Sequence, residues 1–206
     1  MPKKIVQEIT ALDKTKGAFR SINKSLGVLK SGFAGLGAAL SIGGFSSIVK
    51  SSIDAADNIN KLSTRIGAST EALSQYQLVA ERSGLTFKTL TTGLQRMVRR
   101  VSEAANGTGE AKAALAELGL VAADIEELSP ETQFELIADA MSEVESQSDK
   151  VRLAMKLFDT EGVALLQTME GGSKAIREVR DQADALGTTL SSNTADAASD
   201  ANDAMA

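Results

Sequence analysis

The chain has 206 residues, of which 43% are hydrophobic and only 3% aromatic, and this length suits one domain or two small ones. It has no cysteine and no histidine, which excludes disulfides, thiolate chemistry and the commonest general base and metal ligand of proteins. The net charge of −5 is divided unevenly: residues 1–50 hold eight Lys and Arg against two Asp and Glu, whereas residues 101–206 hold seven against twenty-one.

The composition predicts an all-α protein, because Ala, Leu, Ser, Glu and Lys dominate and there are only two prolines. Three regions are expected: an N-terminal heptad-patterned basic helical arm at 1–63, a small multi-helix domain at 64–187, and a low-complexity tail at 188–206. The tail is either flexible or the start of a longer helical region. The first residues, MPKKIVQEI, do not have the pattern of a secretory signal.

A seven-residue repeat runs through the arm. Six large apolar residues occupy equivalent positions: Ile5, Leu12, Phe19, Leu26, Phe33 and Leu40. The partner position three residues later is apolar only in the second half, at Ile22, Leu29 and Leu36. Such a repeat gives a helix one narrow apolar stripe and predicts a coiled-coil seam. The stripe needs a partner helix, which is either another helix of the same chain or a second copy.

The segment SGFAGLGAALSIGGFSSIV, residues 31–49, has no charge and five glycines. Small side chains recur in it every four residues, at Ser31, Gly35, Ala39, Gly43 and Ser47. Such a row lets helix backbones approach closely, and partner contacts must offset a cost of up to about 1 kcal/mol for each interior glycine. We expect a closely packing, partner-dependent helix with a break at Gly43–Gly44. The segment is also just long enough to cross a bilayer.

Glycine stops and N-caps predict several short helices in the middle region. Ser69 or Thr70 caps the first of them, which ends at Gly84. The next has one apolar face, formed by Leu90, Leu94, Met97 or Val98, Val101 and Ala105. Ser129-Pro130-Glu131 is the clearest start signal, because serine accepts from free amides, proline suits the first helical position and glutamate meets the positive end of the dipole. Later helices are expected from Asp149 to Phe158, over VALLQTME, and after Ser173 as N-cap.

The last nineteen residues hold almost no large apolar side chains, so we expect them to bury no core. Asp196, Asp200 and Asp203 would share one face of a helix. As a cation site this pattern is weak, because carboxylates on an exposed helix face are usually solvated. The chain stops without an ending signal, and we expect it to be a piece of a longer protein or the product of a truncated gene.

Motifs for catalysis and cofactor binding are incomplete. Gly35-Leu36-Gly37 resembles the start of a dinucleotide fingerprint but lacks the third glycine and a preceding strand. A Ser-His-Asp arrangement is impossible without histidine. Arg96, Arg99 and Arg100 form a basic helix patch that would either contact phosphates or be a solvated face, and the absence of an aromatic stacking platform favours the solvated face. We expect no enzyme activity, no catalytic residues, no cofactor, no metal site and no DNA contact.

Several stretches, taken in order, carry a resemblance to a known family. ELGL, LSPETQFELIADAM, RLAMKLFDTEGVALLQTM and a glycine pair follow one another between Gly107 and Gly172. Upstream lie KLSTRIGASTEALSQYQLVAERSGLT and LQRMVRR, preceded by the basic helix and the Gly/Ala-rich stretch. In this order and spacing they resemble the N-terminal region of tail tape measure proteins of long-tailed bacteriophages and prophages. One departure is Asp159, where the family commonly has glycine after Leu-Phe.

The resemblance implies a structural and assembly role in the virion tail, which is assembled in the cytoplasm of a bacterial host. Tape measure proteins act as extended helical rulers, and 206 helical residues at about 1.5 Å each would span at most ~300 Å. Family members are far longer, so the chain corresponds to their N-terminal portion. The implied partners are the tail tube protein, tail assembly chaperones and other copies of the chain, with the Ile5–Leu40 stripe as the self-association seam.

The resemblance also implies two alternatives. Some tape measure proteins are thought to help DNA cross the host envelope at infection, and residues 31–49 would then make a transient membrane contact. Others carry peptidoglycan-cleaving modules, but no part of this sequence resembles one. The membrane role therefore stays open as an alternative, whereas an enzyme is not expected.

Overall fold

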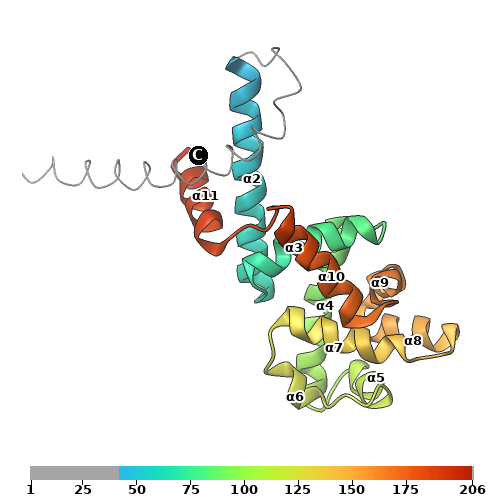
Figure 1. Cartoon of the computed structure of the whole chain (residues 1–206). Coiled ribbons are helices and arrows are strands. Elements are labelled where there is room, and N and C mark those ends of the chain that lie inside the picture. The colour runs from blue at the N-terminus through green and yellow to red at the C-terminus, as the bar shows by residue number, and fades with distance from the viewer. Residues whose placement is uncertain (1–41, 206) are drawn as a thin grey trace, which may run out of the picture. The chain divides into compact units, whose positions relative to one another are not determined.

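The computed structural model describes residues 42–205, with side chains from residue 51 to residue 203, and every regular element in this range is helical. The all-α prediction is therefore confirmed for the described residues. They group into two compact units: unit 1 contains residues 42–60 and 191–205, and unit 2 contains residues 61–190 (Figure 1). The predicted arm seam lies outside the described residues, as does most of the small-residue row: Ile5, Leu12, Phe19, Leu26, Phe33 and Leu40, and Ser31, Gly35 and Ala39.

Unit 1 contains α11 (Ser192–Met205) and most of α2 (Ile42–Ile66). The last residues of α2, after Asn60, belong to unit 2. The first helices wholly within unit 2 are α3 (Thr70–Arg82), α4 (Phe87–Ala105), α5 (Ala111–Glu117) and α6 (Ala122–Glu126). They are followed by α7 (Pro130–Ser142), α8 (Gln147–Phe158), the 3-10 turn η1 (Asp159–Glu161), α9 (Gly162–Met169) and α10 (Gly172–Ala185).

Helix α2 differs from the prediction at its start. It begins at Ile42 and continues through Gly43 and Gly44, so the expected break at this glycine pair is wrong. Of the small-residue row, Gly43 and Ser47 lie on the α2 backbone, and what their side chains contact lies outside the described residues. Glycine weakens a helix but does not end one where the surrounding residues continue the helical pattern.

Unit 1 is held together by hydrogen bonds between α2 and α11. The carboxylate of Asp57, only 3% exposed, accepts from Ser199 Oγ at 2.9 Å and from Asn202 Nδ2 at 2.8 Å. Asn60 Nδ2 donates to Asp196 Oδ1 at 3.2 Å. Ala195 and Ala198 are buried, although we expected this segment to bury no core. The prediction considered only large apolar side chains, whereas small ones allow close helix packing without them.

Unit 2 is built around α4, which contacts α3, α5, α6, α7, α8 and α9 (Figure 1). Its apolar face is buried completely or nearly so at Leu90, Leu94, Met97, Val101 and Ala104. These positions repeat every three or four residues, which is the period of one helix face. The predicted face is therefore correct in phase, with Met97 rather than Val98 inside and Ala104 in place of Ala105.

An aromatic cluster joins three other helices of unit 2. The ring of Phe134 on α7 meets Tyr76 of α3 edge to face, with centroids 5.9 Å apart, and Phe158 of α8 in the same way at 5.8 Å. All three side chains are fully buried. Edge-to-face pairs add to the stabilisation that burial of the rings already supplies.

Two predicted N-caps use different atoms in the structure. Ser129 precedes Pro130 at the start of α7 as expected, but its hydroxyl bonds the Thr132 hydroxyl at 2.9 Å and caps no backbone amide. Helix α10 begins at Gly172 rather than after Ser173, and the Ser173 amide donates to Asp139 Oδ1 of α7 at 2.6 Å. Ser69 does cap α3, accepting from the Ala72 amide at 3.2 Å.

Candidate functional site

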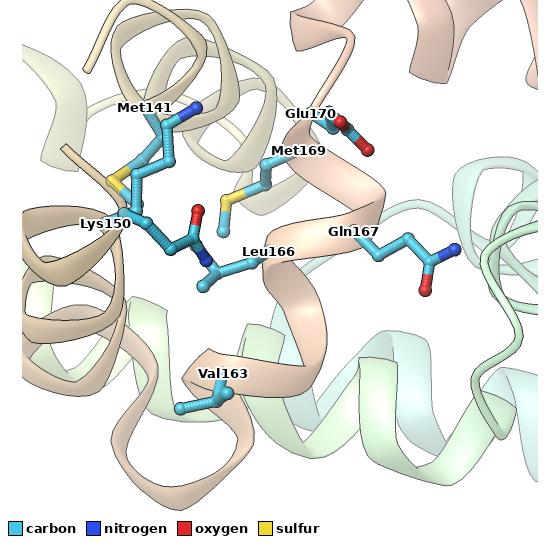
Figure 2. Close-up of a pocket in the computed structure, with 8 residues that line it drawn as sticks. Met141, Lys150, Val163, Leu166, Gln167, Met169 and Glu170 are labelled. Carbon is cyan, nitrogen blue, oxygen red and sulfur yellow. The ribbon is translucent and has the colours of Figure 1, made fainter. Parts of the chain in front are cut away.

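Unit 2 contains a groove of about 310 Å³ between α9 on one side and the end of α7 and start of α8 on the other. We call it the α7–α9 groove. Its lining residues are Met141, Gln147, Lys150, Val163, Leu166, Gln167, Met169 and Glu170. Figure 2 shows the side chains of Leu166 and Met169 on α9 pointing toward Met141 and Lys150. The groove therefore has an apolar floor with polar groups at its edges.

The floor and the rim differ in exposure. Met141 and Met169 are almost fully buried, at 2% and 1% exposure, whereas Val163 is 49% exposed. Methionine side chains are flexible and adapt to different apolar surfaces. A groove with this lining suits an apolar side chain of a partner better than a charged ligand.

A close backbone approach sets the width of the groove. Gly162 starts α9 directly against α8, so close that an added Cβ would collide with the carbonyl group of Ala154 and lie 2.9 Å from the Met155 nitrogen. Real Cβ atoms essentially never come that close to backbone. Because Gly162 has no side chain, α9 can begin in direct contact with the backbone of α8. This contact sets the position of α9 relative to α8, and therefore the positions of Val163 and Leu166.

The charge around the groove is mostly negative. Glu143 and Glu145 lie in the connection between the lining residues Met141 and Gln147, and both are exposed. Neither makes an ion pair in the described part of the chain. Lys150 is the one cation among the lining residues. More widely, residues 113–149 contain ten Asp and Glu and no Lys or Arg.

The predicted basic patch on α4 is neutralised by acidic side chains. Arg99 Nη1 lies 2.6 Å from Glu103 Oε1, one turn along the same helix. Arg96 bonds Glu161 of η1, and Arg100 Nη2 lies 3.6 Å from Asp159 Oδ2. The sequence left two interpretations of this patch, a phosphate site or a freely solvated face. The structure favours neither, because each of the three arginines is paired with a carboxylate. The pairs of Arg96 and Arg100 could not be predicted from local sequence, because Glu161 and Asp159 lie about 60 residues further along the chain.

Asp159, where the resembling family commonly has glycine, has a strained backbone. Its φ of 60° and ψ of −139° lie in a region that is essentially restricted to glycine. It is the one non-glycine residue with positive φ among the described residues. Its carboxylate lies 3.9 Å from Arg96 Nη1 and 3.6 Å from Arg100 Nη2, so the strain is partly offset by ion pairs to α4.

Replacing Asp159 tests this interpretation. Asp159→Ala loses the carboxylate and keeps the strain, whereas Asp159→Gly loses both. We expect the glycine variant to be more stable than the alanine variant by about 1 to 3 kcal/mol, the usual cost of a strained φ and ψ. Urea denaturation of both variants measures the difference. An alanine variant as stable as the glycine variant would show that the backbone there is relaxed.

A buried carboxylate forms the second polar cluster of unit 2. Glu135 on α7 is 4% exposed and binds two guanidinium groups of α10: Arg177 Nε at 2.7 Å and Nη1 of Arg180. Arg180 Nε also donates to Gln75 Oε1 of α3 at 2.8 Å, and its guanidinium lies 5.5 Å from the Tyr76 ring centroid. The hydrogen bond to Glu135 raises the pKa of Arg177. The cluster thus joins α3, α7 and α10 through groups that are already paired.

The same cluster continues to the end of unit 2. Gln75 Nε2 donates to Asp184 Oδ1 at 2.8 Å, and the Thr189 hydroxyl donates to the same oxygen. Hydrogen bonds from Thr189 and Gln75 lower the pKa of Asp184. Burial raises the pKa of Tyr76 far above its ordinary value, so its hydroxyl stays protonated. These pKa shifts follow from local packing, and the arrangement is that of a structural clamp.

Arg152 forms a third ionic link, between α5 and α8. Its Nη1 lies 2.9 Å from Glu117 Oε2, and its Nη2 lies 2.8 Å from Asp149 Oδ1. The hydrogen bonds from Arg152 hold the pKa of both carboxyls below their ordinary values of 4.5 and 3.8. A lowered folded-state pKa stabilises the fold above the ordinary pKa, and this contribution disappears as pH falls through the lowered value.

The acid stability of an Arg152→Gln variant checks this link. Both proteins lose stability on acidification, but the wild type should lose more below about pH 4.5, because only in the wild type does Arg152 lower the pKa of Glu117 and Asp149. Thermal unfolding followed at a series of pH values gives the two curves. Lys88→Gln is the matched control, because Lys88 is exposed and makes no ion pair in the described residues. Parallel curves for wild type and Arg152→Gln would contradict the expectation.

No group of three or more Asp and Glu in residues 42–205 is arranged to hold a metal ion. No helix in this part of the chain is both long enough and apolar enough to cross a membrane. Residues 31–41 of the glycine-rich segment lie outside the described residues.

The groove itself was missed by the sequence analysis. Its lining comes from three consecutive helices, α7, α8 and α9, whose packing no local pattern predicts. Two sequence features lie near it: Asp159, directly after Phe158, and the acidic run before Lys150. Comparison with known proteins finds no match to any family model, curated protein or solved structure.

Proposed function

We propose that this chain is a structural and assembly protein of a long-tailed phage tail, the N-terminal part of a tape measure protein. The observation that carries the proposal is the ordered resemblance between Gly107 and Gly172. The resembling stretches account for α7, α8 and α9, which form the α7–α9 groove, and for the end of α5. The part of the sequence most like the family is thus also the part that builds the α7–α9 groove.

The partners that fit this proposal are the tail tube protein, tail assembly chaperones and further copies of the chain. An apolar groove can bind the apolar face of a helix from a protein partner. The charge distribution, basic at residues 1–50 and acidic at residues 101–206, supports contacts between unlike ends of neighbouring molecules. The virion tail is the proposed location, reached after assembly in the host cytoplasm.

The neighbouring genes and a deletion test the proposal together. Tail tube and chaperone genes should lie directly upstream, with a long helical reading frame continuing downstream. Deleting the coding region from the phage or prophage should remove full-length tails from electron micrographs, and a wild-type copy should restore them. Tails of normal number and length after the deletion would refute the proposed function.

Sedimentation of the purified chain tests the predicted self-association seam. Concentration-dependent oligomers are expected for the wild type. Leu26→Asp places a charge in the stripe and should shift the population toward monomer, because an unpaired charge is costly in an apolar seam. A wild-type chain that remains strictly monomeric at high concentration, and is unchanged by the substitution, would count against the seam.

Membrane contact is the second candidate function. It is supported by the length and the uncharged composition of residues 31–49. Flotation with liposomes, for the chain with and without residues 31–49, provides the test. Equal flotation of the two proteins would exclude this segment as the membrane contact.

A further inference from the structure

Helix α4 ends directly at the single Asn-Gly pair of the sequence, Asn106-Gly107. In such a pair the backbone nitrogen of the second residue can attack the asparagine side chain with little obstruction, because glycine has no Cβ. Every other asparagine of the chain is followed by a residue that has a side chain. Asn106 is the C-cap of α4 and is exposed, so water reaches it. This asparagine is therefore the most reactive one in the sequence.

The folded turn keeps the two reacting groups apart. The Asn106 side chain lies back along α4, where its Nδ2 donates to the carbonyl oxygen of Ser102 at 2.9 Å. The Gly107 N–H donates to the carbonyl oxygen of Ala104 at 2.9 Å, although the nitrogen must lose this hydrogen before it can attack. The Asn106 ψ of 9° places the Gly107 nitrogen beside the Asn106 nitrogen and away from Cβ. The ring of the intermediate can close only after the turn has opened.

Further hydrogen bonds hold this turn closed. Gly107 has a φ of 80°, and the next amide, that of Thr108, donates to the Glu103 carbonyl oxygen at 2.9 Å. Together with the bond from Gly107 to Ala104, this is the arrangement of a Schellman motif. The Thr108 hydroxyl donates to the same Glu103 oxygen at 3.0 Å. Helix ends open far more often than a whole domain unfolds, so local opening of this turn controls access to the reactive geometry.

We propose that Asn106 is a self-modification site controlled by the C-terminal turn of α4. When the turn opens, the Gly107 N–H gives its proton to hydroxide and the nitrogen bonds to Asn106 Cγ. The Cγ–Nδ2 bond breaks, and the amide group takes a proton from water and leaves as ammonia. Water then opens the cyclic imide. Cleavage at Cγ gives aspartate, and cleavage at the main-chain carbonyl carbon gives isoaspartate. The net reaction consumes water, releases ammonia and involves no oxidation or reduction.

Both products weaken the end of α4. A carboxylate has no N–H to donate to the Ser102 oxygen, and its charge stands at the negative end of the helix dipole. Isoaspartate also adds one methylene group to the backbone, so the amides of Gly107 and Thr108 no longer match their carbonyl acceptors. The modification thus irreversibly loosens the helix around which unit 2 is built. The proposal does not depend on the assignment to a phage tail.

Incubation of the full chain at mildly alkaline pH, followed by peptide mapping with mass spectrometry, tests the site. Asn106 should be modified before any other asparagine. A synthetic peptide of residues 102–110 with blocked ends has the same pair without the folded turn, and it should react at least about tenfold faster than the full chain. Equal rates for peptide and chain would overturn the control by the turn. Earlier modification of another asparagine would overturn the site itself.

Two valine substitutions separate local opening from global unfolding. Thr108→Val removes the hydroxyl bond to Glu103 at nearly constant side-chain size, and it should speed the modification about threefold. Thr86→Val is the matched control, because it removes the N-cap bond to the Thr89 amide at the opposite end of the same helix. Acceleration by Thr108→Val alone supports local control. Equal acceleration by both variants, or none by Thr108→Val, would contradict it.

Hydrogen exchange measures the consequence of the modification. Asn106→Asp imitates the aspartate product and should speed exchange of the Gly107 and Thr108 amides about threefold, because the new charge opposes the helix dipole. Asn58→Asp is the control, since it adds the same charge at an exposed position in the interior of α2. Unchanged exchange at these two amides in Asn106→Asp would overturn the proposed loosening of α4.

Discussion

Gly162→Ala is expected to destabilise the chain by about 3 kcal/mol, the upper part of the range for forced overpacking. Alanine is normally the better helix residue, and Gly162 has ordinary helical φ and ψ, so helix propensity alone predicts the opposite sign. The added Cβ would collide with the carbonyl group of Ala154. Because this obstacle is backbone, relief requires α9 to move away from α8. Urea denaturation measures the change in the free energy of unfolding.

Gly93→Ala is the matched control for this prediction. Gly93 is also a buried helical glycine, but its new Cβ would meet the side chain of Leu165, which can shift more easily than backbone. The control should therefore cost clearly less than Gly162→Ala. If Gly162→Ala were neutral or stabilising, α8 and α9 would be free to separate, and the width of the α7–α9 groove would not be fixed as described.

Phe134→Ala is expected to be the most destabilising change in the aromatic cluster, at about 3 to 5 kcal/mol. The ring is fully buried and meets both Tyr76 and Phe158 edge to face, so its removal leaves a cavity and breaks both contacts. Most small domains have only about 5 to 15 kcal/mol of stability, so the loss is a large fraction of the whole. Loss of the cooperative thermal transition, or a much lower midpoint, is the measurement.

Phe87→Ala provides the comparison, because Phe87 is only half buried at the start of α4. The same atoms are removed there, but less apolar surface is lost and the site remains open to water. A similar cost for the two variants would mean that the position of Phe134 between two rings contributes nothing beyond the burial of a phenylalanine.

Much of the helical framework could be predicted from local sequence. The apolar period of α4 identified its buried face, because one face of a helix repeats every three to four residues. Gly84 was expected to end a helix, and it has a positive φ in the structure. Such stops can be predicted from sequence because only glycine adopts that conformation without strain.

The features of the candidate site could not be predicted in the same way. The α7–α9 groove depends on how three helices pack, and its key residue, Gly162, gives no signal inside a helical pattern. Ser173 was expected to be an N-cap, yet the cap comes from Asp139 on another helix. Glu135 binds two arginines of α10, which no local pattern indicates. For Ser173 and Glu135 the decisive partner is distant in sequence, whereas for Gly162 it is a backbone group of the preceding helix.

The division of unit 1 into two segments has a mechanical consequence. Because α2 and α11 flank unit 2 along the chain, tension applied between residues 42 and 205 first loads the hydrogen bonds of Asp57 and Asn60 to α11. Unit 2 bears the force only after these bonds have broken. The α2–α11 pair would thus act as a breakable clasp that shields the groove-bearing unit when the chain is stretched.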